Sequence, residues 1–262
     1  MANDYIFIRK SRNALSSVLH VLMNVLLGAG SILIGLVSGS WLIGFILVLV
    51  SKWRMFAVRP RYLLLNLKSN LVDLIVGFSF VLLGFFSGSE LLPVHYLLAI
   101  SYTVWLIFIK PKTSKNWTLF QALVAVFLGT SASVILCASL NSALLVILEF
   151  IIGYAAARHV LVQNNNSLEN GFPALLLGTL FAELSLFLHS WLIIYTFVDF
   201  GLMLPQLALV LSLLAFMLEK VYSSVELHDG AFRLKPVALP LAFGTLLILI
   251  ILIGFSNPIF NV

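Results

Sequence analysis

The sequence predicts an all-α fold, a polytopic bundle of transmembrane helices, from three observations. Of its 262 residues, 61% are hydrophobic and only 10% are charged, whereas about a quarter of the residues of a typical soluble protein are charged. Apolar runs of about 18 residues or more, each long enough to cross a hydrocarbon core roughly 30 Å thick, recur along the chain. The Lys and Arg residues fall on one side of these runs.

Nine transmembrane segments account for the apolar runs. We expect them at 14–37, 41–56, 62–86, 92–109, 118–136, 142–160, 172–197, 202–222 and 236–255. The purely apolar part of the second segment is short, so a re-entrant second segment, with eight spans in total, is the alternative. No polar stretch between the segments is long enough to fold alone, which predicts one integral membrane domain over 1–262.

The distribution of Lys and Arg predicts the orientation, because short loops rich in these residues stay in the cytoplasm. With nine spans, the N-terminus and the loops that follow even-numbered spans lie on one side. That side and the helix ends next to it hold all fifteen cations: Arg9, Lys10, Arg12, Lys52, Arg54, Arg59, Arg61, Lys68, Lys110, Lys112, Lys115, Arg158, Lys220, Arg233 and Lys235. We therefore expect a cytoplasmic N-terminus, an external C-terminus and a location in the plasma (inner) membrane.

The composition also argues against several classes of function. The net charge of +5 is not clustered on a polar folded face, so no nucleic-acid partner is expected. The chain has no HExxH, GxSxG, CxxC or glycine-rich phosphate loop. Its histidines lack the spacing of metal ligands, so we expect neither a metal nor a cofactor. The single cysteine, Cys137, excludes an intramolecular disulfide.

Three acidic residues, Asp73, Glu149 and Glu183, fall inside the expected spans. Ionisable groups are costly in hydrocarbon, usually face the bundle interior and often mark substrate or proton pathways. Glu149 and Glu183 are expected at similar depth on antiparallel helices with no cation at that depth, so both should be protonated or meet a histidine or a bound cation. With His189 they form the predicted pathway, and Asp73 is expected to pair with Lys68 or a nearby arginine. The alternative is that these groups only form hydrogen bonds between helices.

A basic hinge at 51–73 separates the second and third segments. Clusters of cations beside a span attract anionic lipid headgroups by about 1 kcal/mol per residue. The hinge therefore predicts contact with anionic lipid on the cytoplasmic face, or, as the alternative, only an anchor for topology. Residues 62–69 are amphipathic and expected to lie along the membrane surface, and the cations at the end of the second segment are expected to extend to the headgroups. The lipid-contact set is Lys52, Arg54, Arg59, Arg61 and Lys68.

Small residues at four-residue spacing form three further sets. Such spacing lets two membrane helices approach closely. The sets are Ser31, Gly35 and Gly39; Ala125, Gly129 and Ser133; and Gly153 with Ala157, which share a helix face with Glu149.

These patterns favour three functions in a fixed order. The membrane acids and short loops favour a transporter of small solutes, coupled to protons or cations. The small-residue sets instead favour a non-catalytic scaffold or partner subunit, docked to another membrane protein or to a second copy of the chain. An enzyme acting on lipid headgroups at the basic hinge ranks third, because that side has no evident nucleophile beside a base.

Overall fold

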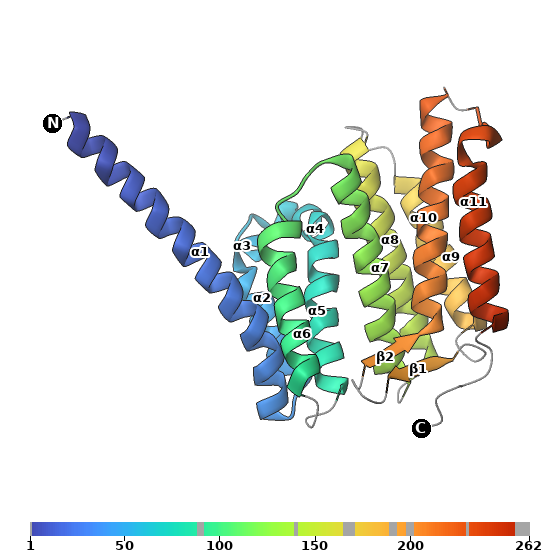
Figure 1. Ribbon diagram of the computed structural model, residues 1–262, viewed down its shortest axis with the longest axis horizontal. Helices are drawn as coiled ribbons and strands as arrows, with labels where there is room; N and C mark the ends of the chain where they lie inside the picture. The colour runs from blue at the N-terminus through green and yellow to red at the C-terminus, as the bar shows by residue number, and fades with distance from the viewer. Residues whose placement is uncertain are drawn as a thin grey trace.

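The first half of the chain forms the left part of Figure 1. The computed structural model describes residues 2–87, 92–138, 141–164, 171–188, 193–197, 202–228 and 231–254. The first-half elements are α1 (Ala2–Ser38), α2 (Trp41–Ser51), α3 (Trp53–Phe56), α4 (Pro60–Ser69), α5 (Leu71–Phe86), α6 (Leu92–Val104) and the π-helical turn η1 (Trp105–Ile109). The N-terminal part of α1 projects away from the other helices.

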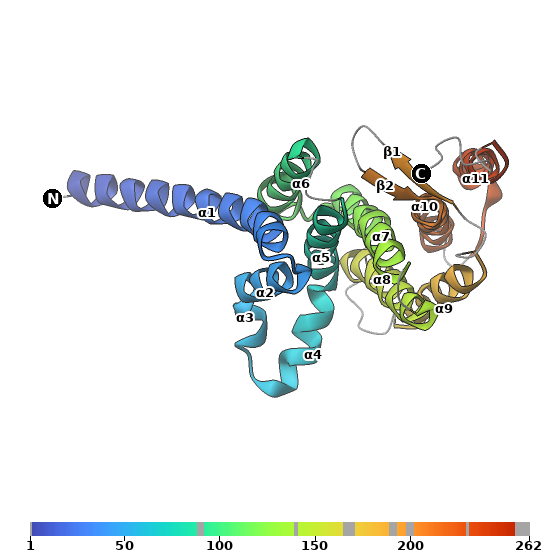
Figure 2. The ribbon, with the colours of Figure 1, turned by 90° about the horizontal axis from the view of Figure 1, so that it is seen from below.

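The second half places four helices side by side, followed by a fifth. Its elements are α7 (Lys115–Cys137), α8 (Ser142–Asn164), α9 (Gly171–Leu188), β1 (Ile194–Phe197), β2 (Leu202–Pro205), α10 (Gln206–Leu227), α11 (Leu234–Leu249) and the π-helical turn η2 (Ile250–Gly254). Helix α8 packs on α7 and α9, and α10 packs on α7 and α11. Helix α5 packs on α7 and so joins the two halves, as Figure 2 shows from below.

The described residues confirm a mostly helical, multi-pass membrane protein. Seven helices among them are long and apolar enough to cross a membrane. Helices α4 and α5, joined at a bend of 64°, would make an eighth. Helix α2, with 11 residues, is shorter than a usual span. The count of nine crossings, and the side on which each terminus lies, stay predictions.

One end of the bundle collects the cationic helix ends. Helices α8 and α10 end there, and α7 and α11 begin there, at the top of Figure 1. We call it the basic end, because the elements meeting there carry Lys110, Lys112, Lys115, Arg158, Lys220, Arg233 and Lys235. The strands β1 and β2 lie at the opposite end. The arrangement agrees with the charge pattern from which the orientation was predicted.

The strands are a finding that the sequence did not predict. They pair antiparallel, with Ile194 opposite Pro205 and Phe197 opposite Leu202. The expected spans 172–197 and 202–222 are therefore wrong where they face each other, since α9 ends at Leu188 and α10 begins at Gln206. A helix over all of 172–197 would exceed the bilayer thickness. β-branched and aromatic residues in 194–197 suit a strand instead.

The predicted small-residue sets mostly pack within the chain. A Cβ on Gly129 would lie 2.8 Å from Ile75 Cγ2, so α7 approaches α5 closely there. Ser31 is fully buried, and a Cβ on Gly44 of α2 would lie 2.6 Å from its carbonyl oxygen. Gly39 is the exception, because it lies in the turn after α1 with a φ of 64°. That conformation favours glycine, so the assignment of Gly39 to a helix-packing face was wrong.

Candidate functional site

Asp73, near the start of α5, is the centre of a buried ion cluster. Its Oδ2 accepts from Lys52, at the junction of α2 and α3, and lies 2.6 Å from Lys110 Nζ, just after η1. Lys52 Nζ also donates to the Asp73 carbonyl oxygen at 3.1 Å, and Trp105 Nε1 donates to Oδ1 at 3.3 Å. The Lys52 side chain is only 8% exposed, whereas that of Lys110 is 43% exposed.

Two expectations about this region were wrong. Lys52 does not extend to the headgroups, since its ammonium is buried against Asp73. Asp73 pairs with Lys52 and Lys110 and not with Lys68, which is exposed on α4. A carboxylate on the neighbouring helix offers a buried ammonium its counter-charge directly, and this contact offsets part of the cost of removing it from water.

A glutamine links the ion cluster to the second half of the chain. Gln121 Nε2, on α7, donates to the carbonyl oxygens of Ile109 at 2.7 Å and Lys112 at 2.9 Å. His159 Nε2, on α8, lies 2.9 Å from Gln121 Oε1. Because that oxygen can only accept, His159 is the donor. These contacts fix the turn after η1 against α7 and α8, and the sequence did not predict them.

Glu149 is fully buried between α8 and α7. Thr130 Oγ1 lies 2.9 Å from its Oε2, and Ser133 Oγ lies 2.5 Å from its Oε1. Ser133 Oγ is also 3.0 Å from the Thr130 carbonyl oxygen. A hydroxyl has one proton to donate. A neutral Glu149 that donates to Ser133, whose own proton goes to the Thr130 carbonyl, satisfies every group in this set.

The second predicted acid lies at a similar level but on a different face. The contacts of Gly153 with Phe181 and of Gly178 with Phe150 align the two antiparallel helices. They place Glu183 of α9 near the level of Glu149, yet its side chain is exposed on the outer surface. It makes no hydrogen bond or ion pair with the part of the chain that the structure describes. His189 lies outside the described residues.

The cavity that stands out in the structure lies between α7, α8, α9 and α10, near the basic end. Its volume is about 350 Å³, and Figure 2 shows the four helices around this position. Phe172 and Leu176 of α9 line it and are themselves exposed, so the cavity opens at that edge. The lining consists of Leu119, Ala122, Leu123, Ala156, Ala157, Val160, Leu161, Phe172, Pro173, Leu176, Leu177, Ala215, Leu218, Glu219, Val221, Tyr222 and Val225.

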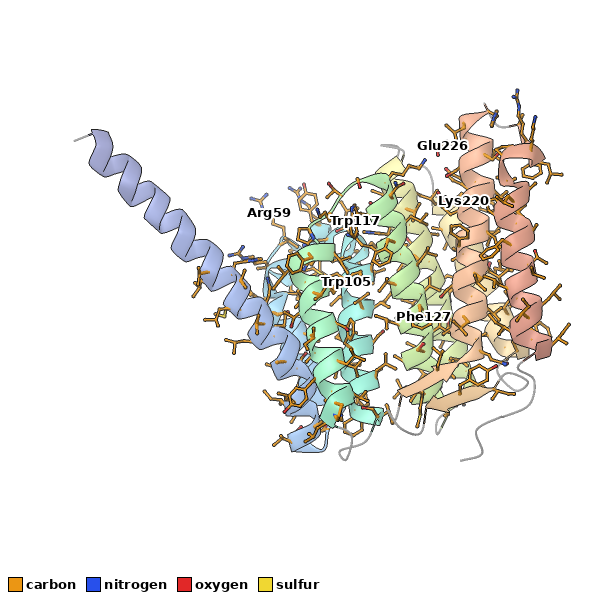
Figure 3. The ribbon with its side chains drawn as sticks, viewed as in Figure 1. Arg59, Trp105, Trp117, Phe127, Lys220 and Glu226 are labelled. Carbon is orange, nitrogen blue, oxygen red and sulfur yellow. The ribbon has the colours of Figure 1, made fainter. Side chains whose placement is uncertain are left out.

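Only Glu219 and Tyr222, both on α10, bring polar side-chain atoms to that lining. The Glu219 side chain is 9% exposed; its Oε1 accepts from Ser223 at 2.7 Å. Lys220 Nζ lies 3.0 Å from Oε2, but without the geometry of a hydrogen bond. One turn further along α10, Oε2 of Glu226 is buried and has no hydrogen-bond partner among the described residues. Figure 3 labels Lys220 and Glu226 on the half of α10 nearest the basic end.

The sequence contained a signal for this acidic face of α10. Residues 219, 222 and 226 follow the i, i+3, i+7 spacing of one helix face. We had assigned 219–235 to a polar loop, so the helix was expected to end at 222, five residues before its observed end at Leu227.

No group of three or more His, Cys, Asp or Glu residues in the described ranges is arranged to hold a metal ion. No protein-family model, curated protein or solved structure matches this chain.

Proposed function

We propose that this multi-pass membrane protein is a transporter of small solutes and that its solute binds in the cavity between α7, α8, α9 and α10. The cavity is the observation that carries the proposal. Its volume of about 350 Å³ lies within the range of roughly 300–1,000 Å³ that small-molecule sites occupy, and such sites form between the helices of bundles. Its open edge at Phe172 and Leu176 offers a route of entry.

Glu149 is the residue that we propose for coupling to protons. It shares α8 with Ala157, which lines the cavity, and eight residues of helix separate the two by roughly 12 Å. Its contacts with Thr130 and Ser133 fit a protonated resting state. Loss of that proton would leave a buried charge, so the charged form is favoured only if helices α7 and α8 rearrange. Glu183 and His189 stay predicted members of this pathway.

The proposal also gives the basic end a location. We place it at the cytoplasmic face of the plasma membrane, with anionic lipid bound near α4. Helix α4 has no buried residue, which suits a helix lying at the membrane surface. The exposed cations that remain for lipid contact, after Lys52 is assigned to Asp73, are Arg54, Arg59, Arg61 and Lys68.

The scaffold alternative loses the feature that first supported it. The predicted docking faces at Ser31 and at Gly129 are occupied by other helices of the same chain. The enzyme alternative gains no support either, because the buried cations near the basic hinge are held by Asp73.

A pair of identical substitutions tests the proposal. Ala157→Phe places a large side chain at the cavity wall, whereas Ala238→Phe makes the same change on an exposed face of α11. Each full-length variant is reconstituted into proteoliposomes, and uptake of labelled sugars, amino acids, nucleosides and lipophilic ions is measured. We expect uptake of at least one solute by the wild type and by Ala238→Phe, and none by Ala157→Phe. Uptake no greater than that of empty liposomes, or equal uptake by both variants, would contradict the proposal.

The same assay tests the role of Glu149. Glu149→Gln mimics the protonated acid, since its amide can donate to Ser133 and accept from Thr130. We expect this variant to bind solute but to lose the acceleration of uptake by a pH gradient. A variant that responds to the gradient as the wild type does would remove Glu149 from the coupling mechanism.

A further inference from the structure

We infer that the cavity selects lipophilic monovalent cations, an inference that rests on the proposed function and names its class of solute. Fifteen of the seventeen lining residues are Leu, Ala, Val, Phe or Pro. Walls of this kind offer a solute dispersion contacts and no hydrogen bonds. They therefore select a body that is itself apolar, and they exclude sugars and other solutes that would lose their hydration without replacement.

The charge inside the cavity comes from Glu219. It is the only charged residue of the lining, and its side chain is nine-tenths buried. Glu226 adds a second buried carboxylate oxygen without a hydrogen-bond partner on the same face of α10. An anionic solute would be repelled at this position, whereas a cation would gain an attraction strengthened by the apolar surroundings.

The contacts of Glu219 show how a cation could enter. Its present partner, Lys220, is 34% exposed and does not line the cavity. The two groups lie 3.0 Å apart but are not aligned as a hydrogen bond. A lipophilic cation in the cavity would replace the ammonium beside Oε2, and Lys220 would turn towards water. The solute and Lys220 thus compete for one carboxylate.

The lining also favours an organic cation over a metal ion. Tyr222 offers an aromatic ring next to Glu219, and such rings attract cations whose charge is spread over an apolar body. Ca²⁺ and Mg²⁺ need about six or more oxygen ligands, and the walls around Glu219 are apolar. A single carboxylate with one ring suits a monovalent cation with no need for further hydrogen bonds.

Two ions of nearly the same size and shape, tetraphenylphosphonium and tetraphenylborate, test the inference. Binding of each to the purified full-length chain in detergent is measured by scintillation proximity, with Ala157→Phe as the blank. We expect saturable binding of the phosphonium cation that exceeds binding of the borate anion at least tenfold. Equal binding of the two ions would overturn the inference.

Substitutions at the carboxylate and its competitor give opposite expected effects. Glu219→Gln should weaken cation binding at least tenfold, whereas Lys220→Met should strengthen it several-fold, because the competing ammonium is gone. Misfolding cannot produce tighter binding, so Lys220→Met keeps the test decisive even if Glu219→Gln is unstable. Glu183→Gln, which removes an exposed acid of α9 outside the lining, should leave the affinity unchanged. Unchanged affinity in both Glu219→Gln and Lys220→Met would overturn the inference.

Failure of the inference can be told apart from failure of the proposed function. If Ala157→Phe blocks uptake of a neutral solute and Glu219→Gln does not, the cavity is a transport site without charge selection. If the cation binds equally to wild type and to Ala157→Phe, the cavity is not the site, and both statements fall.

Discussion

At the scale of single residues, the buried charges explain which side chains the fold depends on. Lys52 is buried and reaches two oxygens of Asp73, whereas Lys110 keeps access to water. Removing one partner of a buried ion pair leaves the other charged and unpaired, which typically costs about 3–5 kcal/mol. Asp73 is thus more important for stability than its single charge suggests.

We expect Asp73→Asn to lower the stability of the protein by an amount in that range. The midpoint of thermal unfolding in detergent, followed by the loss of monodisperse protein, measures the effect. Lys68→Gln, a change of an exposed charge on α4, should leave the midpoint within a degree or two, since exposed pairs are worth under about 1 kcal/mol. Adding Lys52→Met to Asp73→Asn should recover part of the loss. Equal midpoints for Asp73→Asn and Lys68→Gln would show that the cluster does not stabilise the fold.

The sequence predicted that Asp73 would be paired but not with which residue. Its position inside an apolar segment was enough to require a partner. Lys68, five residues earlier, was the nearest cation along the chain. The 64° bend between α4 and α5 separates the directions of the two helices, and the actual partners come from α2 and from the turn after η1. Such contacts depend on helix packing that spacing alone does not encode.

At the scale of elements, the contact between α8 and α9 depends on two glycines. A Cβ on Gly153 would lie 2.9 Å from the Leu177 carbonyl oxygen, and a Cβ on Gly178 would lie 2.9 Å from that of Phe150. Backbone atoms cannot move aside as side chains can, so any larger residue must separate the two helices. Without a hydrophobic driving force between helices in lipid, close packing of this kind holds them together.

Gly153→Ala should therefore destabilise the protein, by about 1–3 kcal/mol as for other overpacked sites. Gly30→Ala is the matched control, because nothing lies within 4 Å of a Cβ built on that helical glycine. It should be neutral or slightly stabilising, since alanine favours helix over glycine by about 1 kcal/mol. The thermal midpoints of both variants in the same detergent decide the matter. A Gly153→Ala protein as stable as Gly30→Ala would show that α8 and α9 are less closely packed than described.

Elements differ in how far the sequence predicted them. The amphipathic segment 62–69 and the helix break at Pro60 were expected, and α4 begins at that proline. Gly153 was predicted at a tight helix contact, and it has one. The strands β1 and β2 were missed because a run such as 194–197 is apolar in either conformation, and its hydropathy suits a span as well as a strand.

At the scale of the whole molecule, composition predicted the class of protein but not its cavity. An apolar composition and cations gathered at one end are properties of the chain itself, and the described helices agree with both. The cavity depends on how four helices leave space between them. Ala156 and Ala157 of α8 leave room there because they are small, and the sequence pattern alone marked Ala157 only as a packing residue.

The central claim is that solute occupies this cavity during transport, and blocking it after folding tests that claim most directly. Ala157→Cys and Phe187→Cys are made in a Cys137→Ala background, the first in the cavity lining and the second on an exposed face of α9. Each folded variant is modified with a lipophilic maleimide, and mass spectrometry confirms complete reaction. In proteoliposomes, we expect modified Ala157→Cys to lose solute uptake and modified Phe187→Cys to keep it. Full uptake by completely modified Ala157→Cys would contradict the account.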